Sequence, residues 1–203
     1  GEEVFSEDDI AELMAEAERD GAYRFPRLSA IVRPQPFAGE WRANMTRITR
    51  PGGTVDGTDA DDLTFAEVEG RRQVELYARF LRERVPGFAN SHVIEIAPQI
   101  GIRETRRIAR RYVLTGDDVL GAADFADAIG CNPWPAERHK ADREIEFRWI
   151  GGRGYHQVPY RCLLPLGVDN LLVAGRCVSA TPIAQSSVRV SGPCMAMGQA
   201  AGL

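Results

Sequence analysis

The chain is poor in several residues that mark common classes of protein site. It has four cysteines, three histidines and, at Lys140, a single lysine among 203 residues. None of the cysteines forms a C-x-x-C pair, and no histidine stands at metal-ligand spacing to one of them. We therefore expect no metal site, and we expect the cysteines to be reduced thiols of a cytoplasmic protein.

Long apolar runs and a basic charge balance are also missing. No apolar stretch is long enough to span a bilayer, and the first residues do not have the layout of a signal peptide. The net charge of −4 argues against a general nucleic-acid binder. A hydrophobic content of 44% with 27% charged residues is typical of a globular protein. We expect neither a membrane nor a nucleic acid as a partner.

The most informative stretch runs from Gly167 to Leu203. A short apolar run, Leu171–Ala174, suits a strand that is covered on both faces. Gly175 follows at once and would let another group approach the backbone closely. Pro193 suits the first turn of a closing helix, because its missing N–H costs nothing there. A strand, a glycine and a helix N-terminus together predict a site for an anionic or electron-rich ligand.

The motifs of this stretch resemble the C-terminal signature of FAD-dependent oxidoreductases of the glutathione-reductase-like type. They are Asn170–Arg176, Ser186–Val190 and Cys194–Gly202, and the resemblance continues upstream through Val158–Pro165. It implies FAD as the cofactor, with the closing helix aimed at the flavin ring. The residues that it implies for cofactor binding are Gly175, Arg176, Ser186, Val188, Arg189, Gly192 and Pro193.

A second block, Pro98–Arg107, resembles a family motif in which an extended segment brings an Arg-Glu pair towards flavin and substrate. The resemblance implies that Arg103 and Glu104 are the catalytic residues. The forked guanidinium would hold a substrate carboxylate or a flavin edge, and Glu104 would orient it or accept a proton. Neighbouring residues on an extended chain point to opposite sides. The alternative is structural: salt-bridged side chains that fasten one sheet to the next.

The chain divides into three parts on this interpretation: a helical lead-in over 1–21, a substrate-binding domain over 22–165, and an incomplete part of an FAD-binding domain over 166–203. The fold class is α/β, with α+β character in this chain: an antiparallel or mixed sheet with helices, then the strand and helix of a Rossmann-like domain. No G-x-G-x-x-G follows a strand, so we expect the dinucleotide-binding half to lie outside this sequence.

The elements expected in the first two parts follow from periodicity, caps and turn residues. The helices are Ser6–Asp20, Thr64–Val85 and a short one from Gly116, and the strands are Leu28–Val32, Trp41–Ile48, His92–Ala97, Ile108–Leu114 and Glu144–Ile150.

The expected function is transfer of hydride equivalents from a small-molecule substrate to flavin, with this chain inactive by itself. Two other functions stay open. One is a non-catalytic α+β module for binding or structure that holds no flavin. The other is a thiol hydrolase that uses Cys162 or Cys177 with His156. A hydrogen-bonded strand histidine is the simpler interpretation of His156.

Overall fold

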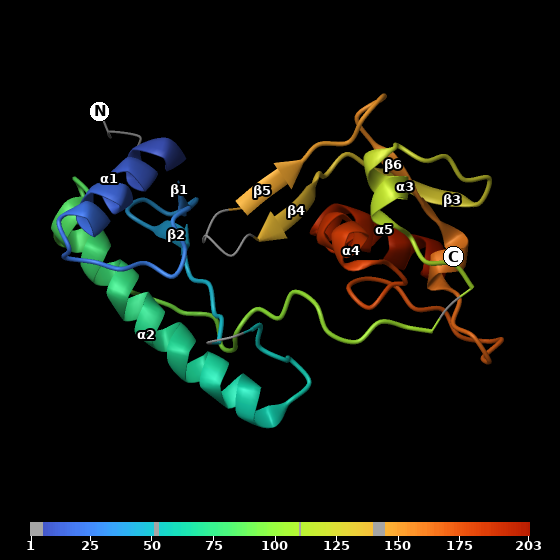
Figure 1. Ribbon diagram of the computed structural model, residues 1–203, viewed down its shortest axis with the longest axis horizontal. Helices are drawn as coiled ribbons and strands as arrows, with labels where there is room; N and C mark the ends of the chain where they lie inside the picture. The colour runs from blue at the N-terminus through green and yellow to red at the C-terminus, as the bar shows by residue number, and fades with distance from the viewer. Residues whose placement is uncertain (1–5, 51–52, 110, 140–144) are drawn as a thin grey trace. The chain divides into compact units, whose positions relative to one another are not determined.

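The computed structural model describes residues 6–50, 53–109, 111–139 and 145–203. Within these ranges it contains helices and three antiparallel sheets of two strands each (Figure 1). The α+β character expected of this chain is confirmed. The chain folds as two compact units, one reaching from the N-terminal side to Gly101 and the other formed by most of the chain from Ile102 onwards. The division into a lead-in over 1–21, a substrate-binding domain over 22–165 and an FAD-binding part over 166–203 stays a prediction.

The first unit begins with α1, Glu7–Arg19. Ser6 and Asp9 form a capping box: the Asp9 N–H donates to Ser6 Oγ over 3.1 Å, and the Ser6 N–H donates to Asp9 Oδ2 over 2.8 Å. This box satisfies N–H groups that have no partner inside the helix. Gly21, with φ of 77°, turns the chain away just after the helix. The predicted helix and both of its ends are confirmed.

The longest helix is α2, Ala60–Arg84. Its N-cap is Asp59, whose side chain accepts from the Asp62 N–H over 2.9 Å. The predicted start at Thr64 is wrong by one helical turn, because an acidic cap earlier in the sequence serves the same purpose. Thr64 lies inside the helix and donates its hydroxyl to the Ala60 carbonyl. The predicted end before Pro86 is confirmed.

The core of this unit is aromatic. Phe25 stacks on Tyr23 and on Tyr77, with ring centroids 5.3 and 5.4 Å apart, and it meets Phe80 edge to face at 5.0 Å. All four rings are buried, and they pin the segment after α1 to the buried stripe of α2.

One strand of this unit is shorter than predicted, ending at Asn44 and not at Ile48, and the other is displaced from Leu28–Val32 towards the C-terminus. β1, Ile31–Pro34, pairs antiparallel with β2, Trp41–Asn44. The strand predicted over His92–Ala97 is wrong, since the structure assigns none there. Val93 and Ile94 are 49% and 66% exposed, and none of the described sheets includes them. An apolar run becomes a strand only where another strand pairs with it.

The second unit is built from short elements around a separate apolar core. They are α3 Gly116–Leu120, β3 Ala128–Asn132, β4 Ala136–His139, β5 Ile145–Arg148, β6 His156–Pro159, the 3₁₀ helix η1 Tyr160–Leu163, α4 Pro182–Val188 and α5 Ser191–Gly202. β3 pairs with β6 and β4 with β5, while α5 packs on β3 and α4 on β4. The predicted helices at Gly116 and near Pro193 are confirmed, and the strand over Glu144–Ile150 is confirmed at Ile145–Arg148; Glu144 lies outside the described residues. Sequence reasoning missed α4, β3 and β4.

The buried strand predicted over Leu171–Ala174 is wrong. These residues belong to no strand, and Leu171 is 48% exposed. The Val173 N–H donates to the Leu163 carbonyl, but no described strand flanks the run, so nothing covers it as a sheet would. The covered segment is Val178–Ala180 instead, and Ala180 forms a parallel bridge with Leu114. Of the strand predicted over Ile108–Leu114, the structure assigns this bridge at Leu114, and Arg110 lies outside the described residues. The described residues contain no parallel sheet, so the predicted Rossmann-like part is not seen in them.

Candidate functional site

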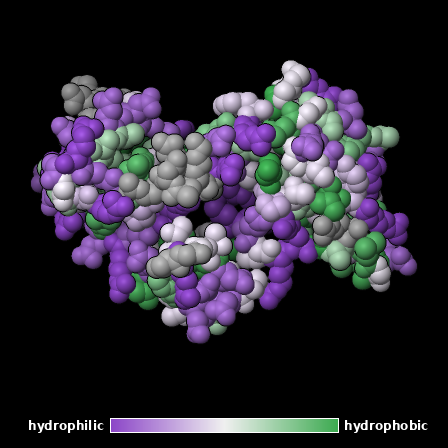
Figure 2. Space-filling view, in the orientation of Figure 1, coloured by the Kyte–Doolittle hydropathy of each residue, from purple (hydrophilic) through white to green (hydrophobic). Residues whose placement is uncertain are grey.

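A hollow of about 490 Å³ opens in the second unit beside the start of α5. Its walls are mainly aromatic and apolar. The lining residues are Cys131, Asn132, Pro133, Trp134, Pro135, Phe147, Trp149, Val190, Gly192 and Pro193. Figure 2 shows apolar side chains at the surface of this unit among more polar ones. A concave, mostly apolar site of this size is typical of small-molecule and cofactor sites.

The N-terminus of α5 borders this hollow. Val190 is the N-cap, and no side chain caps the first turn. The first intrahelical bond of this end runs from Cys194 N–H to the Val190 carbonyl over 3.2 Å, and Pro193 has no N–H. The N–H groups of Ser191 and Gly192 therefore stand at the positive end of a helix of 12 residues. The helix tip that the sequence predicted to face a ligand does lie at a hollow.

The aromatic walls were missed as site residues. Phe147 and Trp149 alternate with polar residues in and just after β5, and both are exposed, by 46% and 75%, and line the hollow. Trp134 comes from the connection between β3 and β4. The sequence did contain a signal for Phe147 and Trp149. They form an apolar strand face that no other predicted element covers, and such a face can line a binding site.

A carboxylate that sequence reasoning also missed joins two predicted site residues. Glu137, on β4, accepts at Oε2 from Arg103 Nη2 over 3.0 Å and from Arg189 Nη2 over 3.2 Å. Its other oxygen, Oε1, accepts from the indole N–H of Trp134 over 3.1 Å. The Glu137 side chain is only 7% exposed. The structure thus gathers Arg103 from the catalytic set and Arg189 from the cofactor set around one buried anion, next to a wall of the hollow.

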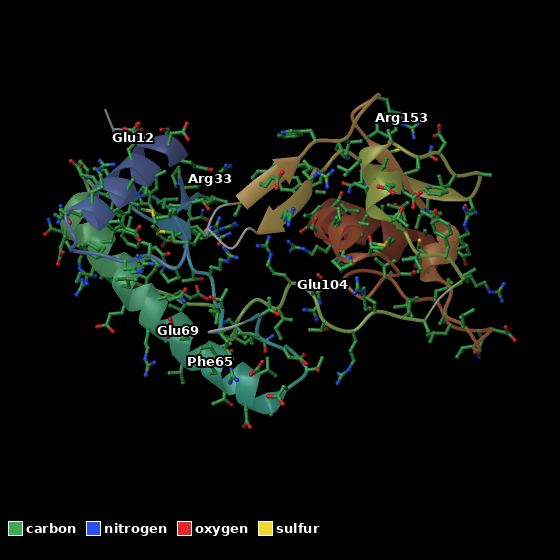
Figure 3. All side chains as sticks on the ribbon, in the orientation of Figure 1. Glu12, Arg33, Phe65, Glu69, Glu104 and Arg153 are labelled. Carbon is green, nitrogen blue, oxygen red and sulfur yellow. The ribbon has the colours of Figure 1, made fainter. Side chains whose placement is uncertain are left out.

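Glu104, which is labelled in Figure 3, pairs with a different residue from Arg103, as expected of adjacent residues on an extended segment. Its carboxylate lies 3.2 Å from Arg107, and Arg107 donates to the Ala180 carbonyl over 2.6 Å. These bonds fasten the segment of Glu104 to the covered residues before α4, as in the structural alternative. Neither Arg103 nor Glu104 lines the hollow itself.

Gly175 and Arg176 lie beside the same segment. Arg176 donates from Nη1 to the Ile102 carbonyl. Gly175 has φ of 86°, and its carbonyl accepts from the Val178 N–H in a turn. A Cβ added there would meet nothing within 4 Å, so the backbone conformation, not the surrounding protein, requires glycine.

Ser186 and Val188 lie in α4 and not in a loop. The Ser186 hydroxyl accepts from the Glu137 backbone N–H over 2.9 Å and donates to the Ile183 carbonyl over 2.7 Å. Val188 is fully buried, backbone included, so it supports its neighbours from within the core and is not accessible to a cofactor. Two buried oxygens in this region, Gln185 Oε1 and Thr181 Oγ1, have no hydrogen-bond partner within the described residues.

Comparison with known proteins gives one result. The sequence model of a family described as FAD dependent oxidoreductase matches residues 2–203. The chain belongs to this family. No curated protein and no solved structure matches it.

The residues at the hollow fit the cofactor that the name of this oxidoreductase family implies. A flavin ring is flat and largely apolar with a polar edge, and the hollow offers aromatic walls and an uncapped helix N-terminus. The orphaned oxygens of Gln185 and Thr181, in the segment where cofactor contacts were predicted, could accept hydrogen bonds that the described protein residues do not provide.

His156 is not free for acid–base chemistry. It is fully buried on β6, and Nδ1 lies 3.0 Å from the Gln157 carbonyl oxygen, which can only accept. Nδ1 therefore carries the proton, and Nε2 accepts from the Asn132 amide 3.1 Å away. Burial lowers the pKa of His156 and keeps the ring neutral. The interpretation as a hydrogen-bonded strand histidine is confirmed.

Cys162 does not suit a nucleophile. Its side chain is fully buried, and burial raises the pKa of the thiol to about 12. A thiol hydrolase needs the thiolate, so the structure contradicts that alternative for Cys162.

The described part of the chain contains no helix that combines the length and apolar character needed to cross a membrane. Within the same residues, no three His, Cys, Asp or Glu side chains gather as a group that could hold a metal ion.

Proposed function

We propose that this chain is the substrate-binding and flavin-facing part of an enzyme that transfers hydride equivalents from a small molecule to FAD, in the glutathione-reductase-like group of the family. The observation that carries the proposal is the aromatic hollow at the uncapped N-terminus of α5. FAD would supply the redox chemistry when bound, and the protein would supply binding, orientation and charge.

Each part of the hollow has a role in this proposal. Trp134, Phe147 and Trp149 offer flat apolar faces that stack on a planar ring and exclude water from it. The N–H groups of Ser191 and Gly192 would donate to the electron-rich edge of the ring, and the helix dipole favours negative charge there.

Arg103 and Glu104 remain the proposed catalytic pair. Arg103 is about half exposed, and its partner Glu137 also bonds to the wall residue Trp134. Its guanidinium suits an anionic group on the small-molecule substrate. Gly175, Arg176, Ser186 and Arg189 are the proposed cofactor contacts on the adjoining turn and helix, and the buried Val188 supports them from the core.

Two glycines on α5 allow a matched test with lumiflavin, the isolated flavin ring. A side chain at Gly192 would enter the space beside the hollow, and one at Gly198 would stand on the exposed part of the same helix. A Cβ at either position meets nothing within 4 Å, so the fold accommodates both changes. The measurement is quenching of lumiflavin fluorescence during titration with the 203-residue chain.

We expect wild type and Gly198→Leu to bind lumiflavin alike, and Gly192→Leu to bind about tenfold more weakly or not at all. Equal binding by Gly192→Leu would move the flavin site away from the tip of α5. A wild-type chain that binds no lumiflavin would instead favour the module that does not hold flavin.

A further inference from the structure

We infer that Glu137 is a positioning residue that fixes the indole of Trp134 as a wall of the hollow and ties that wall to Arg103 and Arg189. The consequence for flavin binding rests on the proposed function. The positioning itself does not, because every contact in it is made between residues of this chain.

Among the residues that the structure describes, Glu137 is the one that bonds to the indole of Trp134. Trp134 is 42% exposed, and Nε1–H is the single hydrogen-bonding group of its side chain. That group donates to Glu137 Oε1 over 3.1 Å. The backbone of Trp134 is fixed separately, by its N–H to Asn132 Oδ1 and by its carbonyl to the Ser187 hydroxyl. Loss of the Glu137 bond would therefore free the ring while the backbone stays in place.

Charge keeps the Glu137 carboxylate in position. A buried carboxylate is stable only when it is paired, and this one pairs through Oε2 with two guanidinium groups. Arg189 is itself 13% exposed, and its pKa is lowered, first by burial and then by the nearby Arg103 cation. Glu137 thus separates two cations that would otherwise repel each other.

The backbone of Glu137 supplies a further anchor. Its N–H donates to the hydroxyl of Ser186 on α4 over 2.9 Å, while Arg189 is the C-cap of the same helix. A change at α4 or at Arg103 would consequently reach the hollow through one carboxylate. Glu137 therefore positions a wall of the hollow and does not only support the fold.

Tryptophan fluorescence tests the positioning without any flavin. The chain has three tryptophans, so Trp41→Phe with Trp149→Phe leaves Trp134 as the only reporter. In that background we expect Glu137→Gln to shift the emission to the red and to raise quenching by acrylamide. The control is Glu146→Gln, the same change on the neighbouring strand β5, which should alter neither.

Glu137→Asp separates positioning from unfolding. It keeps the charge that the two arginines need but withdraws the carboxylate from the indole by one methylene. We expect the same red shift, with a circular dichroism spectrum like that of wild type. An unchanged Trp134 emission in a folded Glu137→Asp or Glu137→Gln variant overturns the inference.

A double-mutant cycle then measures what the positioning does for binding, with lumiflavin as the probe. Trp41 and Trp149 are kept in every variant of this cycle. We expect Glu137→Gln and Trp134→Phe each to weaken binding by about tenfold, and the double variant to be no weaker than Trp134→Phe alone. Additive losses would mean that Glu137 does not act through Trp134. If wild type binds no lumiflavin, the proposed function fails, and the acrylamide experiment alone decides the role of Glu137.

Discussion

His156 Nε2 lies 3.1 Å from the amide nitrogen of Asn132, and both side chains are buried. The two residues are directly opposite each other in the β3–β6 pair. The Asn132 amide also donates to Ser187 Oγ over 2.9 Å. A neutral histidine therefore closes the end of this sheet against α4, which gives it a structural role that depends on pH.

The stability of the second unit should fall in mild acid because of His156. Burial lowers the pKa of His156 in the folded chain below the 6.5 of an unperturbed histidine. The unfolded chain then takes up the proton first, so stability is full above pH 6.5 and is lost as the pH falls through 6.5 towards the folded pKa. Urea unfolding of wild type and His156→Gln over this range tests it. The wild-type advantage should shrink as the pH falls; a constant difference would contradict the sign.

Substitutions at Gly175 can distinguish two reasons for a glycine there, the backbone conformation and a contact with the cofactor. Its φ of 86° disfavours β-branched residues, so Gly175→Val should lower the free energy of unfolding by about 1–2 kcal/mol. Gly175→Asn should cost less, because asparagine enters this region more readily. If Gly175 also faces the cofactor, Gly175→Asn will lose affinity for FAD in a titration while remaining folded. Unchanged FAD affinity would leave only the turn as the reason for glycine.

The cysteines should differ sharply in reactivity. Cys131 is exposed at the hollow, whereas Cys162 is buried with its pKa raised to about 12. Iodoacetamide at mildly alkaline pH should modify Cys131 in the native chain and Cys162 only after unfolding. Mass spectrometry of digested peptides distinguishes the sites. Rapid native modification of Cys162 would revive the thiol hydrolase.

The true start of α2 can be tested by two alanine substitutions. Asp59→Ala removes the side chain that caps the Asp62 N–H and should cost about 1 kcal/mol of stability. Thr64→Ala removes only a hydroxyl bonded to the Ala60 carbonyl inside the helix, and alanine is the better helix former there. Thermal unfolding of both variants should rank Asp59→Ala clearly below Thr64→Ala. The reverse order would restore Thr64 as the cap.

Local signals in the sequence predicted local structure well. Ser6 with Asp9, Gly21 and Pro193 placed ends of α1 and α5 because caps and turn residues act on backbone groups within a few positions. The apolar runs at Leu171–Ala174 and His92–Ala97 misled, because a strand also requires a partner that the run does not encode.

The candidate site was predictable only in part for a similar reason. The motifs indicated Arg103 and Arg189 separately, but nothing in the sequence shows that they share Glu137. The hollow is assembled from β3, β5 and α5, so its walls emerge only when distant segments pack together.

The burial of α4 has a consequence for how the second unit opens. Residues Ala184–Val188 are all buried, and the polar ones among them bond outwards: Gln185 to Arg176, Ser186 to Glu137, Ser187 to Trp134. No face of these five residues is left to water, so this part of α4 cannot fray by itself, whereas Pro182 and Ile183 at its start are exposed. It leaves its place only when the strands around it lose their partners too, and the unit should therefore melt as a single cooperative body.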